Sequence, residues 1–298
     1  MDQDAYISTL RPITSSELTG APAEQRATKL VADLFISLRG AISYTLLTQA
    51  WIMVYVVALQ RVQEPTNLDV RRLNAITRKL QQQPQKLIFP AMECQSTLDI
   101  HTDSGYRRLN GIDDEIKGYG IRGMNLLRRG KRRNGHDDVI HLLDSVCKSH
   151  RLLIRSSYGA EMIASAHGTD DAFPTIVTLH ELKHGVLTSQ QLRNIREHGG
   201  LCLKITLTTD AESVYKSLTS RDLKVPAEKT LLGHVKWIRE LLELGIITAI
   251  QWCDTRDMTA DGHTKGSVER QLLLQLMQGR QKFHHDVKRH TPHRTNPT

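Results

Sequence analysis

The spacing of apolar residues along the chain changes once, between Gln81 and Pro90, and this change limits the folds that the chain can adopt. Before it, apolar residues recur at helical spacing, whereas several later segments alternate apolar and polar residues as half-buried strands do. The QQQPQ run at 81–85 and Pro90 interrupt helical structure at the change itself. We therefore predict a helical segment over 1–90, an α/β domain over 91–280 and a basic, disordered tail over 281–298.

The composition indicates a globular chain with a basic surface. Its 298 residues, 39% of them hydrophobic, can bury a core. Forty Lys and Arg against 32 Asp and Glu give a net charge of +8, which favours a polyanionic partner such as nucleic acid. The cysteines are widely spaced without a CxxC pair, which argues against a disulfide framework and a thiolate metal site and favours a reducing compartment. They are Cys94, Cys147, Cys202 and Cys253.

The first 90 residues predict helices. Apolar segments lie near 28–38 and 41–60, and a helix over 68–82 follows Asn67, which we expect to be its N-cap. No residue from Gly40 to Gln60 is charged, so this run is long enough to cross a bilayer if it is helical. Its serine, threonine, glutamine and tyrosine residues favour buried helices over a membrane span. The N-terminus carries early acids and no apolar core of a signal peptide.

The later segments predict strands and helices in alternation. Strands are expected at 97–103, 119–127, 139–146, 201–210 and 246–253, with RRGKRRNG (128–135) as a hairpin loop between the second and third. Helices are expected at 228–244 and 267–278, where leucine-rich stripes end at glycine. This order predicts a mixed sheet covered by helices.

Four separated acids lie at the edges of these predicted elements: Asp103, Glu161, Asp210 and Asp261. Acids placed in this way can converge in space. Phosphodiester hydrolysis requires an activated water and a stabilised leaving oxygen, and two divalent ions can provide both. Carboxylate ligands suit Mg²⁺ or Mn²⁺ better than zinc.

The sequence around these acids resembles the ribonuclease H domain of copia-type retrotransposon polyproteins. RSSYGAEMIAS resembles the family's Ser-Ser-x-x-Glu-Ala-Glu-Tyr block and places the catalytic Glu at Glu161. TTDAES resembles the block of the third acid, Asp210, and CDTRDMTADGHTKG resembles the closing block, with a Thr, then Ala-Asp, then a Thr-Lys pair, which gives Asp261. GYGIRGM (118–124) resembles the family's Ser-Gly-Tyr strand. The resemblance covers about residues 35–280 and is weakest between 165 and 200.

Two blocks depart from the family. Near Asp103 the usual acid pair and Trp-Ala-Gly are replaced by one acid and Ser104-Gly105-Tyr106. Upstream, LRGAISYTLLTQAWIMVYVVALQR and PTNLDVRRLNAITRKL resemble the stretch that joins the reverse transcriptase to its nuclease, but Thr48-Gln49-Ala50-Trp51 stands for the usual Thr-Arg-Pro-Asp. No aromatic-x-Asp-Asp polymerase motif occurs, so we expect no polymerase activity from this chain alone.

The resemblance implies a ribonuclease H-like α/β fold: a mixed five-stranded sheet flanked by helices and preceded by a small helical segment. It implies hydrolysis of the RNA strand of an RNA–DNA hybrid with two Mg²⁺ or Mn²⁺ ions. Asp103 would bridge both ions, Glu161 and Asp210 would complete one site, and Asp261 would help to hold the other. The rest of a Pol polyprotein is an expected partner, no membrane is expected, and the location would be a cytoplasmic virus-like particle or the nucleus.

The basic run is a candidate for contacts to the phosphates of the DNA strand. Its charged residues are Arg128, Arg129, Lys131, Arg132 and Arg133. A nuclear localisation patch and a plain solvated loop are the alternatives. His263, two residues after Asp261, is a candidate for product release or for protonating the leaving oxygen, although a lone His beside an acid is more often only hydrogen-bonded.

Two other functions stay open. HELKH (180–184) matches the zinc-peptidase pattern HExxH, although a third ligand would have to be a distant acid such as Glu197 or Glu212. The second alternative is a decayed element that keeps the fold and the basic surface without catalysis. The two departing blocks motivate this alternative, and the presence of all four acids argues against it.

Overall fold

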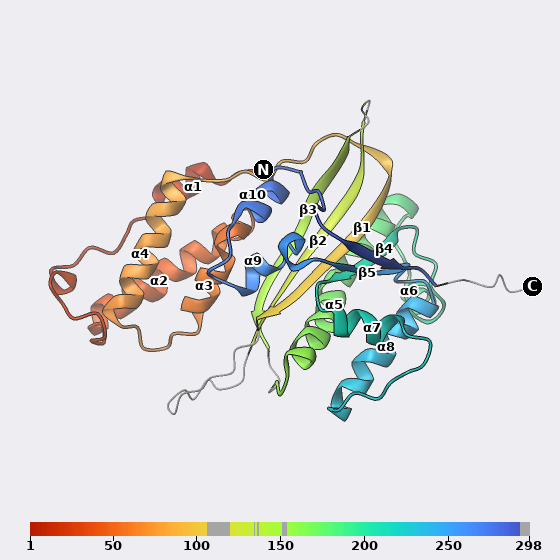
Figure 1. The fold of residues 1–298 in the computed structure, drawn as a ribbon. Helices are drawn as coiled ribbons and strands as arrows, with labels where there is room; N and C mark the ends of the chain where they lie inside the picture. The colour runs from red at the N-terminus through yellow and green to blue at the C-terminus, as the bar shows by residue number, and fades with distance from the viewer. Residues whose placement is uncertain (106–119, 134, 136, 151–153, 293–298) are drawn as a thin grey trace, which may run out of the picture. The chain divides into compact units, whose positions relative to one another are not determined.

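The structure, a computed structural model, describes residues 1–105, 120–133, 135, 137–150 and 154–292. These residues form two compact units (Figure 1). The helical unit contains Met1–Ile88 and Glu269–Gln278, and the sheet unit contains Phe89–Val268 and Gly279–Thr298. The division after Ile88 lies beside the expected boundary at residue 90. The short segment 269–278, which we placed in the α/β domain, belongs to the helical unit instead.

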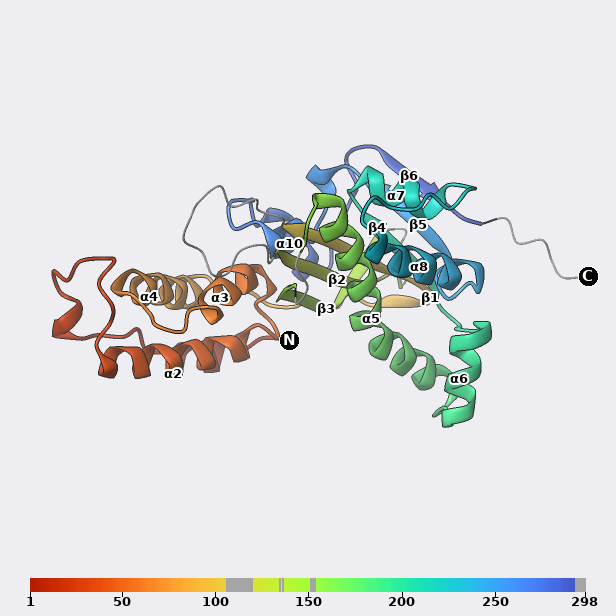
Figure 2. The same cartoon turned by 90° about the horizontal axis from the view of Figure 1, so that it is seen from below.

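The helical unit consists of helices that bury apolar side chains. Its elements are α1 (Asp4–Thr9), η1 (Ser16–Leu18), α2 (Lys29–Thr45), η2 (Ala50–Ile52), α3 (Met53–Gln60), α4 (Asn67–Gln82) and α10 (Gln271–Met277). Figure 2 shows α2 beside α3 and α4. Thr66, not Asn67, is the N-cap of α4: its hydroxyl accepts a hydrogen bond from the Asp69 amide, and the Asp69 carboxylate accepts one from the Thr66 amide.

The helix α10 joins this unit because of its apolar face. Leu273, Leu276 and Met277 are buried. The Arg270 guanidinium lies over the Tyr55 ring, 4.8 Å from its centroid, and donates to the Tyr55 hydroxyl. The uncharged run from Gly40 to Gln60 is divided among α2, η2 and α3. None of the described helices combines the length and the apolar character that a bilayer crossing needs.

The sheet unit contains a mixed sheet with the strand order β3-β2-β1-β4-β5-β6. Its strands are β1 (Met92–Gly105), β2 (Ile121–Arg132), β3 (Asp138–Ser149), β4 (Lys204–Thr209), β5 (Ala249–Cys253) and β6 (Val287–His290). The strands β1, β2 and β3 are antiparallel neighbours, β4 and β5 run parallel to β1, and β6 is antiparallel to β5. Within the described ranges the predicted mixed sheet is present, with six strands instead of five.

The sixth strand corrects the prediction of a disordered tail over 281–298. Its exposed sequence, VKRH, has no apolar face, but its backbone pairs with the edge strand β5. Side chains add to this pairing: Lys288 lies 4.6 Å from the centroid of the Trp252 ring, and Arg289 donates to Thr206 Oγ1. Residues 293–298 of the tail lie outside the described part.

The basic run is also corrected, because most of it is strand and not loop. β2 continues through Arg132 and pairs with β3 as far as Lys131 and Asp138, so the connection is confined to about 133–137. The predicted hairpin is therefore present with a shorter turn. Gly118 and Tyr119 of the GYGIRGM motif, Tyr106, and Asn134 of the basic run lie outside the described residues.

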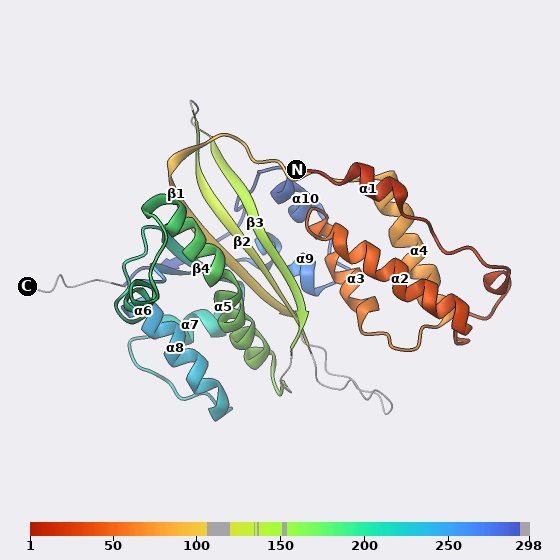
Figure 3. The same cartoon turned by 180° about the vertical axis from the view of Figure 1, so that it is seen from behind.

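Helices cover both faces of the sheet. The long helix α5 (Ser157–His184) lies behind β1 and β2 in Figure 1 and in front of them in Figure 3. It packs with α7 (Glu212–Thr219) and α8 (Leu232–Glu243), the latter preceded by η3 (Lys229–Leu231). The buried core between these helices and the sheet includes Leu98, Ile100, Leu207, Met162 and Val235. On the other face, η4 (Thr255–Asp257) leads into α9 (Asp261–Thr264), which packs on β1 and β2.

Candidate metal centre

Asp103 lies near the end of the central strand β1 and is fully buried. Side chains alternate across a strand, so His101 and Asp103 share the face of β1 that α9 covers, while Ile100 and Thr102 face α5. Thr259 shares a hydrogen bond with His101 Nδ1, and the Thr264 hydroxyl donates to Asp103 Oδ2. Asp103 is therefore fixed by α9 at the end of the sheet.

Glu161 reaches the same place from the first turns of α5. The N-cap of this helix is Ser156, whose hydroxyl accepts a hydrogen bond from the Gly159 amide. Glu161 Oε1 accepts a hydrogen bond of 3.3 Å from the amide of Ser104, the residue after Asp103. Its other oxygen, Oε2, is buried and has no hydrogen-bond partner among the residues that the structure describes.

Asp210 directly follows β4, the parallel neighbour of β1. All residues of this strand except Lys204 are buried, as expected for a central strand. The Trp252 indole on β5 donates to the Asp210 carbonyl at 2.7 Å and so fixes the backbone at this point. Because β1 and β4 are parallel, their carboxyl ends bring Asp103 and Asp210 to the same edge of the sheet.

The three side chains converge. Asp103, Glu161 and Asp210 each offer a carboxylate oxygen, and these oxygens lie within 4.8 Å of one another. Burial raises the pKa of Glu161 well above its usual value, and the charges of Asp103 and Asp210 raise it further. Burial and the charge of Asp103 also raise the pKa of Asp210. Three carboxylates held together in this way favour a bound cation or bound protons.

Asp261, the fourth predicted acid, is buried on α9 but is not part of the three-acid cluster. It is connected to the cluster through Lys265, whose ammonium lies 2.7 Å from Asp261 Oδ1 and 3.5 Å from Asp103 Oδ1. Burial and the charge of Asp103 raise the pKa of Asp261 to about 8. We did not assign roles to Thr264 and Lys265 from the sequence, although they are the Thr-Lys pair of the closing block.

The donor set fits a hard divalent cation. All three converging groups are carboxylates, which Mg²⁺ and Mn²⁺ prefer as ligands. The clearest sign of a cation site is Glu161 Oε2, which is buried and finds no partner in the part of the chain that the structure describes, because a buried carboxylate oxygen without a partner is costly unless an ion binds it. Asp103, Glu161 and Asp210 would hold one ion. The position between Asp103 and Asp261, where a second ion is expected, faces the Lys265 ammonium.

No family model and no curated protein matches this chain. Among solved structures, the chain is similar to a protein described as LC9-RNase H1, a type 1 RNase H with the type 2 active-site motif. The TM-score is 0.26 and the sequence identity is 13%, over 55% of this chain and 63% of that chain. The chain thus covers less than two thirds of that protein, and a similarity at this TM-score supports no argument about fold or activity.

The candidate nucleic-acid contacts on β2 have partners within the sheet unit. Arg129 forms a 2.8 Å ion pair with Asp99 and donates to Gln281 Oε1. Arg128 donates to Ser96 Oγ, and Lys131 forms an ion pair with Asp138. Arg132 and Arg133 are exposed. Binding of phosphates by these residues stays a prediction, and Arg129 would have to share its guanidinium with Asp99.

His263 packs between α9 and β2. It is fully buried, and its Nε2 shares a 2.8 Å hydrogen bond with Asn125 Oδ1 on β2. The structure therefore gives this histidine a hydrogen-bonded packing position between α9 and the sheet. This agrees with the interpretation that it is only hydrogen-bonded.

The HELKH motif forms the last turns of α5, far along this helix from Glu161. Glu181 Oε1 accepts a hydrogen bond of 2.9 Å from the Leu187 amide just beyond the helix. The third metal-binding side chain near His180 and His184 is Cys202, which corrects our expectation of a distant acid. Glu212, one of those acids, instead pairs with Lys216 and Lys288.

We expect the stability of the protein without divalent ions to fall as the pH rises from about 4 to 8. The raised pKa of Asp261 means that the folded state binds more protons than the unfolded state between the usual value of 3.8 and about 8. Stability falls with pH in such a window. Lys265 opposes this effect, and the raised pKa values of Glu161 and Asp210 reinforce it.

Thermal unfolding in EDTA, followed by circular dichroism, should show a Tm lower by about 5 °C or more at pH 8 than at pH 5. Millimolar Mg²⁺ should reduce this difference, because bound cations replace the lost protons. An unchanged Tm over this range would contradict the burial of Asp261 beside the charge of Asp103 as the cause of its raised pKa.

Proposed function

We propose that the sheet unit is a metal-dependent nuclease of the ribonuclease H type, which hydrolyses the RNA strand of an RNA–DNA hybrid. The observation that carries this proposal is the convergence of Asp103, Glu161 and Asp210 from β1, α5 and the end of β4. The strand order 3-2-1-4-5, with β1 to β3 antiparallel and β4 and β5 parallel to β1, is the arrangement expected of this fold. The sequence blocks around the acids support the same function.

The protein groups have distinct roles in this proposal. Asp103, Glu161 and Asp210 would hold one divalent ion, and Asp103 with Asp261 would hold a second. Two such ions supply an activated water near neutral pH and stabilise the leaving oxygen. Thr264 holds the Asp103 carboxylate in place, and the Trp252 indole holds the Asp210 backbone. Burial raises the pKa of Glu161, Asp210 and Asp261 and also strengthens the attraction of the charged carboxylates for a cation, so a bound ion would replace the protons that burial favours.

We propose RNA–DNA hybrid as the substrate because of the resemblance to the copia-type polyproteins, together with the net charge of +8. The RNA strand would be recognised through its 2′-hydroxyls in the minor groove. By the same resemblance, the rest of a Pol polyprotein would be a partner, and the protein would act in a cytoplasmic virus-like particle or in the nucleus.

One observation favours the alternative of a hybrid-binding protein without cleavage. The Lys265 ammonium lies between Asp103 and Asp261, where it competes with a second divalent ion for the same oxygens. In this alternative the fold and the basic surface persist, while one cation position is filled by the protein's own side chain.

The experiment that tests the proposal is cleavage of an RNA–DNA hybrid labelled on either strand, in Mg²⁺ or Mn²⁺, by the full chain. We expect cleavage of the RNA strand alone, abolished by EDTA and by Asp210→Asn. The matched control is Asp222→Asn, because Asp222 is exposed and outside the cluster; this variant should cut as the parent does. If the chain binds the hybrid but never cuts it at any concentration of either ion, the non-catalytic alternative is correct.

A further inference from the structure

A second group of metal-binding side chains lies at the other end of α5. His180 and His184 are one turn apart in the last turns of the helix, with their ring centroids 4.8 Å apart. Cys202 lies in the segment that leads into β4. One ligand atom from each of the three residues lies within 4.8 Å of the others. The end of the helix and the segment before β4 thus bring two imidazoles close to a thiol. Cys202 lies 18 residues after His184 in the sequence.

One hydrogen bond fixes the position of Cys202 relative to the helix: the Cys202 amide donates to His180 Nδ1 at 3.2 Å. A neutral imidazole has one acceptor nitrogen, so binding of an ion by His180 would replace this hydrogen bond. His180 is buried, Cys202 is half-buried and His184 is exposed. The group is therefore anchored on its inner side by His180 and open to solvent on its outer side at His184, where an ion can enter.

The donor chemistry points to zinc. Imidazole nitrogen and thiolate sulfur are the ligands that Zn²⁺ prefers, and both are poor ligands for Mg²⁺. Tetrahedral zinc would place its nitrogen and sulfur ligands about 3.3–3.6 Å apart. The present separations are up to 4.8 Å. Binding would therefore require them to shorten, through rotation of the exposed His184 and of the Cys202 side chain. The last turn of a helix also favours positive charge.

We propose that His180, His184 and Cys202 bind one zinc ion, with water as the fourth ligand, and that the ion connects the end of α5 to the entry of β4. This site is separate from the carboxylate cluster and does not depend on the proposed nuclease function.

The arrangement of Glu181 indicates a structural ion and not a peptidase centre. In an HExxH peptidase the Glu acts as a base toward the zinc-bound water. Here Glu181 Oε1 accepts a hydrogen bond from the Leu187 amide and holds the turn that follows the helix. The third ligand is a cysteine from a neighbouring segment. The ion would therefore connect the two ends of the segment 185–201, which lies between His184 and Cys202.

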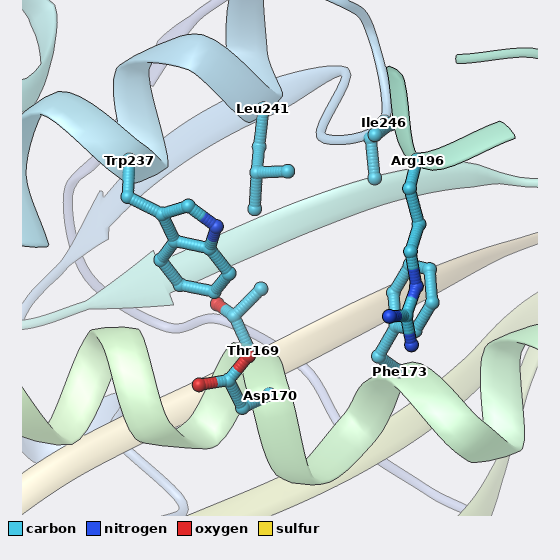
Figure 4. Close-up of a pocket in the computed structure, with 7 residues that line it drawn as sticks. All are labelled: Thr169, Asp170, Phe173, Arg196, Trp237, Leu241 and Ile246. Atoms are coloured by element: carbon cyan, nitrogen blue, oxygen red, sulfur yellow. The ribbon is translucent and has the colours of Figure 1, made fainter. Parts of the chain in front are cut away.

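Apart from such an ion, few contacts hold the segment 185–201 to the rest of the sheet unit. It contains α6 (Ser189–His198), in which Ile195 is the only buried residue, followed by Gly199 and Gly200 at φ of 78° and 108°. The Arg196 guanidinium lies over the Phe173 ring of α5, 5.1 Å from its centroid, beside a cavity of about 200 Å³ (Figure 4). Few apolar contacts hold such a segment, so an ion at its base would restrict its opening.

The test uses the full chain, prepared free of metal and titrated with Co²⁺ as a spectroscopic substitute for zinc. We expect one equivalent of Co²⁺ to give a thiolate-to-metal charge-transfer band and tetrahedral d–d bands, both removed by stoichiometric Zn²⁺. Cys202→Ser should abolish the charge-transfer band, and His184→Gln should weaken Co²⁺ binding by at least about tenfold. Because His184 is exposed, its replacement leaves the folded core intact.

Controls separate this site from other metal-binding groups. Cys94→Ser and His198→Gln alter an exposed cysteine and an exposed histidine outside the cluster, and both should bind Co²⁺ as the parent does. Zn²⁺ should also slow proteolysis within 185–201 in the parent and not in Cys202→Ser. A titration without a thiolate band, or an equal band in Cys202→Ser, would overturn the proposal, and neither result would bear on hybrid cleavage.

Discussion

Asp103→Asn is expected to reduce hybrid cleavage by about a thousandfold or more without lowering the Tm of the metal-free protein at pH 8. Among the acids that the structure describes, Asp103 is the one that both lies within the three-acid cluster and shares Lys265 with Asp261. Loss of one group that acts only in the reaction commonly costs a factor of this size. Asparagine keeps the shape and can still accept the hydrogen bond from Thr264, and it removes a charge that repels Glu161, Asp210 and Asp261.

Two measurements separate this effect from unfolding. Mg²⁺ should raise the Tm of the parent chain and leave that of Asp103→Asn nearly unchanged, because the variant has lost its main cation ligand. As a control, Asp171→Asn removes the acid that pairs with Arg122 at 2.6 Å, outside the cluster. It should lower the Tm and retain cleavage. A variant at Asp103 that cleaves at more than a tenth of the parent rate would exclude this residue as a metal ligand.

Gly123→Ala is expected to destabilise the sheet unit by about 1–3 kcal/mol and to impair cleavage although Gly123 touches no substrate. Gly123 lies opposite Asp103 in the β1–β2 ladder. An added Cβ would meet His263 Cβ at 2.8 Å and the Ala260 carbonyl oxygen at 2.9 Å. Both neighbours belong to the tightly packed segment that carries α9, so this segment must move. Asp261 and Lys265 would move with it.

Urea unfolding and the hybrid cleavage assay on the same preparation measure both parts of this prediction. Gly233→Ala is the matched control, because Gly233 is exposed on α8 and a Cβ there meets nothing within 4 Å. Alanine at this helical position should be neutral or stabilising by up to about 1 kcal/mol. If Gly123→Ala were as stable and active as the parent, close packing of α9 on β2 would not be what positions Asp261.

The local structure was largely predictable from the spacing of apolar residues. The spacing gave α4 to within one residue, the hairpin of β2 and β3, the strands β4 and β5, and α8, because each of these buries one face against the core. The positions of the acids followed as well, since Asp103 and Asp210 end predicted strands. The family resemblance supplied the roles of Glu161 and Asp261. Both lie on helices, and the spacing of apolar residues in a helix does not indicate a site.

The sequence by itself determined the helical character of the first 90 residues, the strands β1 to β5 and the four candidate acids, because these follow from neighbours along the chain. The tertiary structure alone decided which of the acids meet: three converge, and Asp261 is held to Asp103 through Lys265. It also decided that VKRH joins the sheet as β6 and that Cys202 reaches the HELKH histidines. The physical reason is the same in each case. A polar edge strand, a bridging lysine and a thiol find their partners in segments that are distant in the sequence. The local spacing of apolar residues does not predict those contacts.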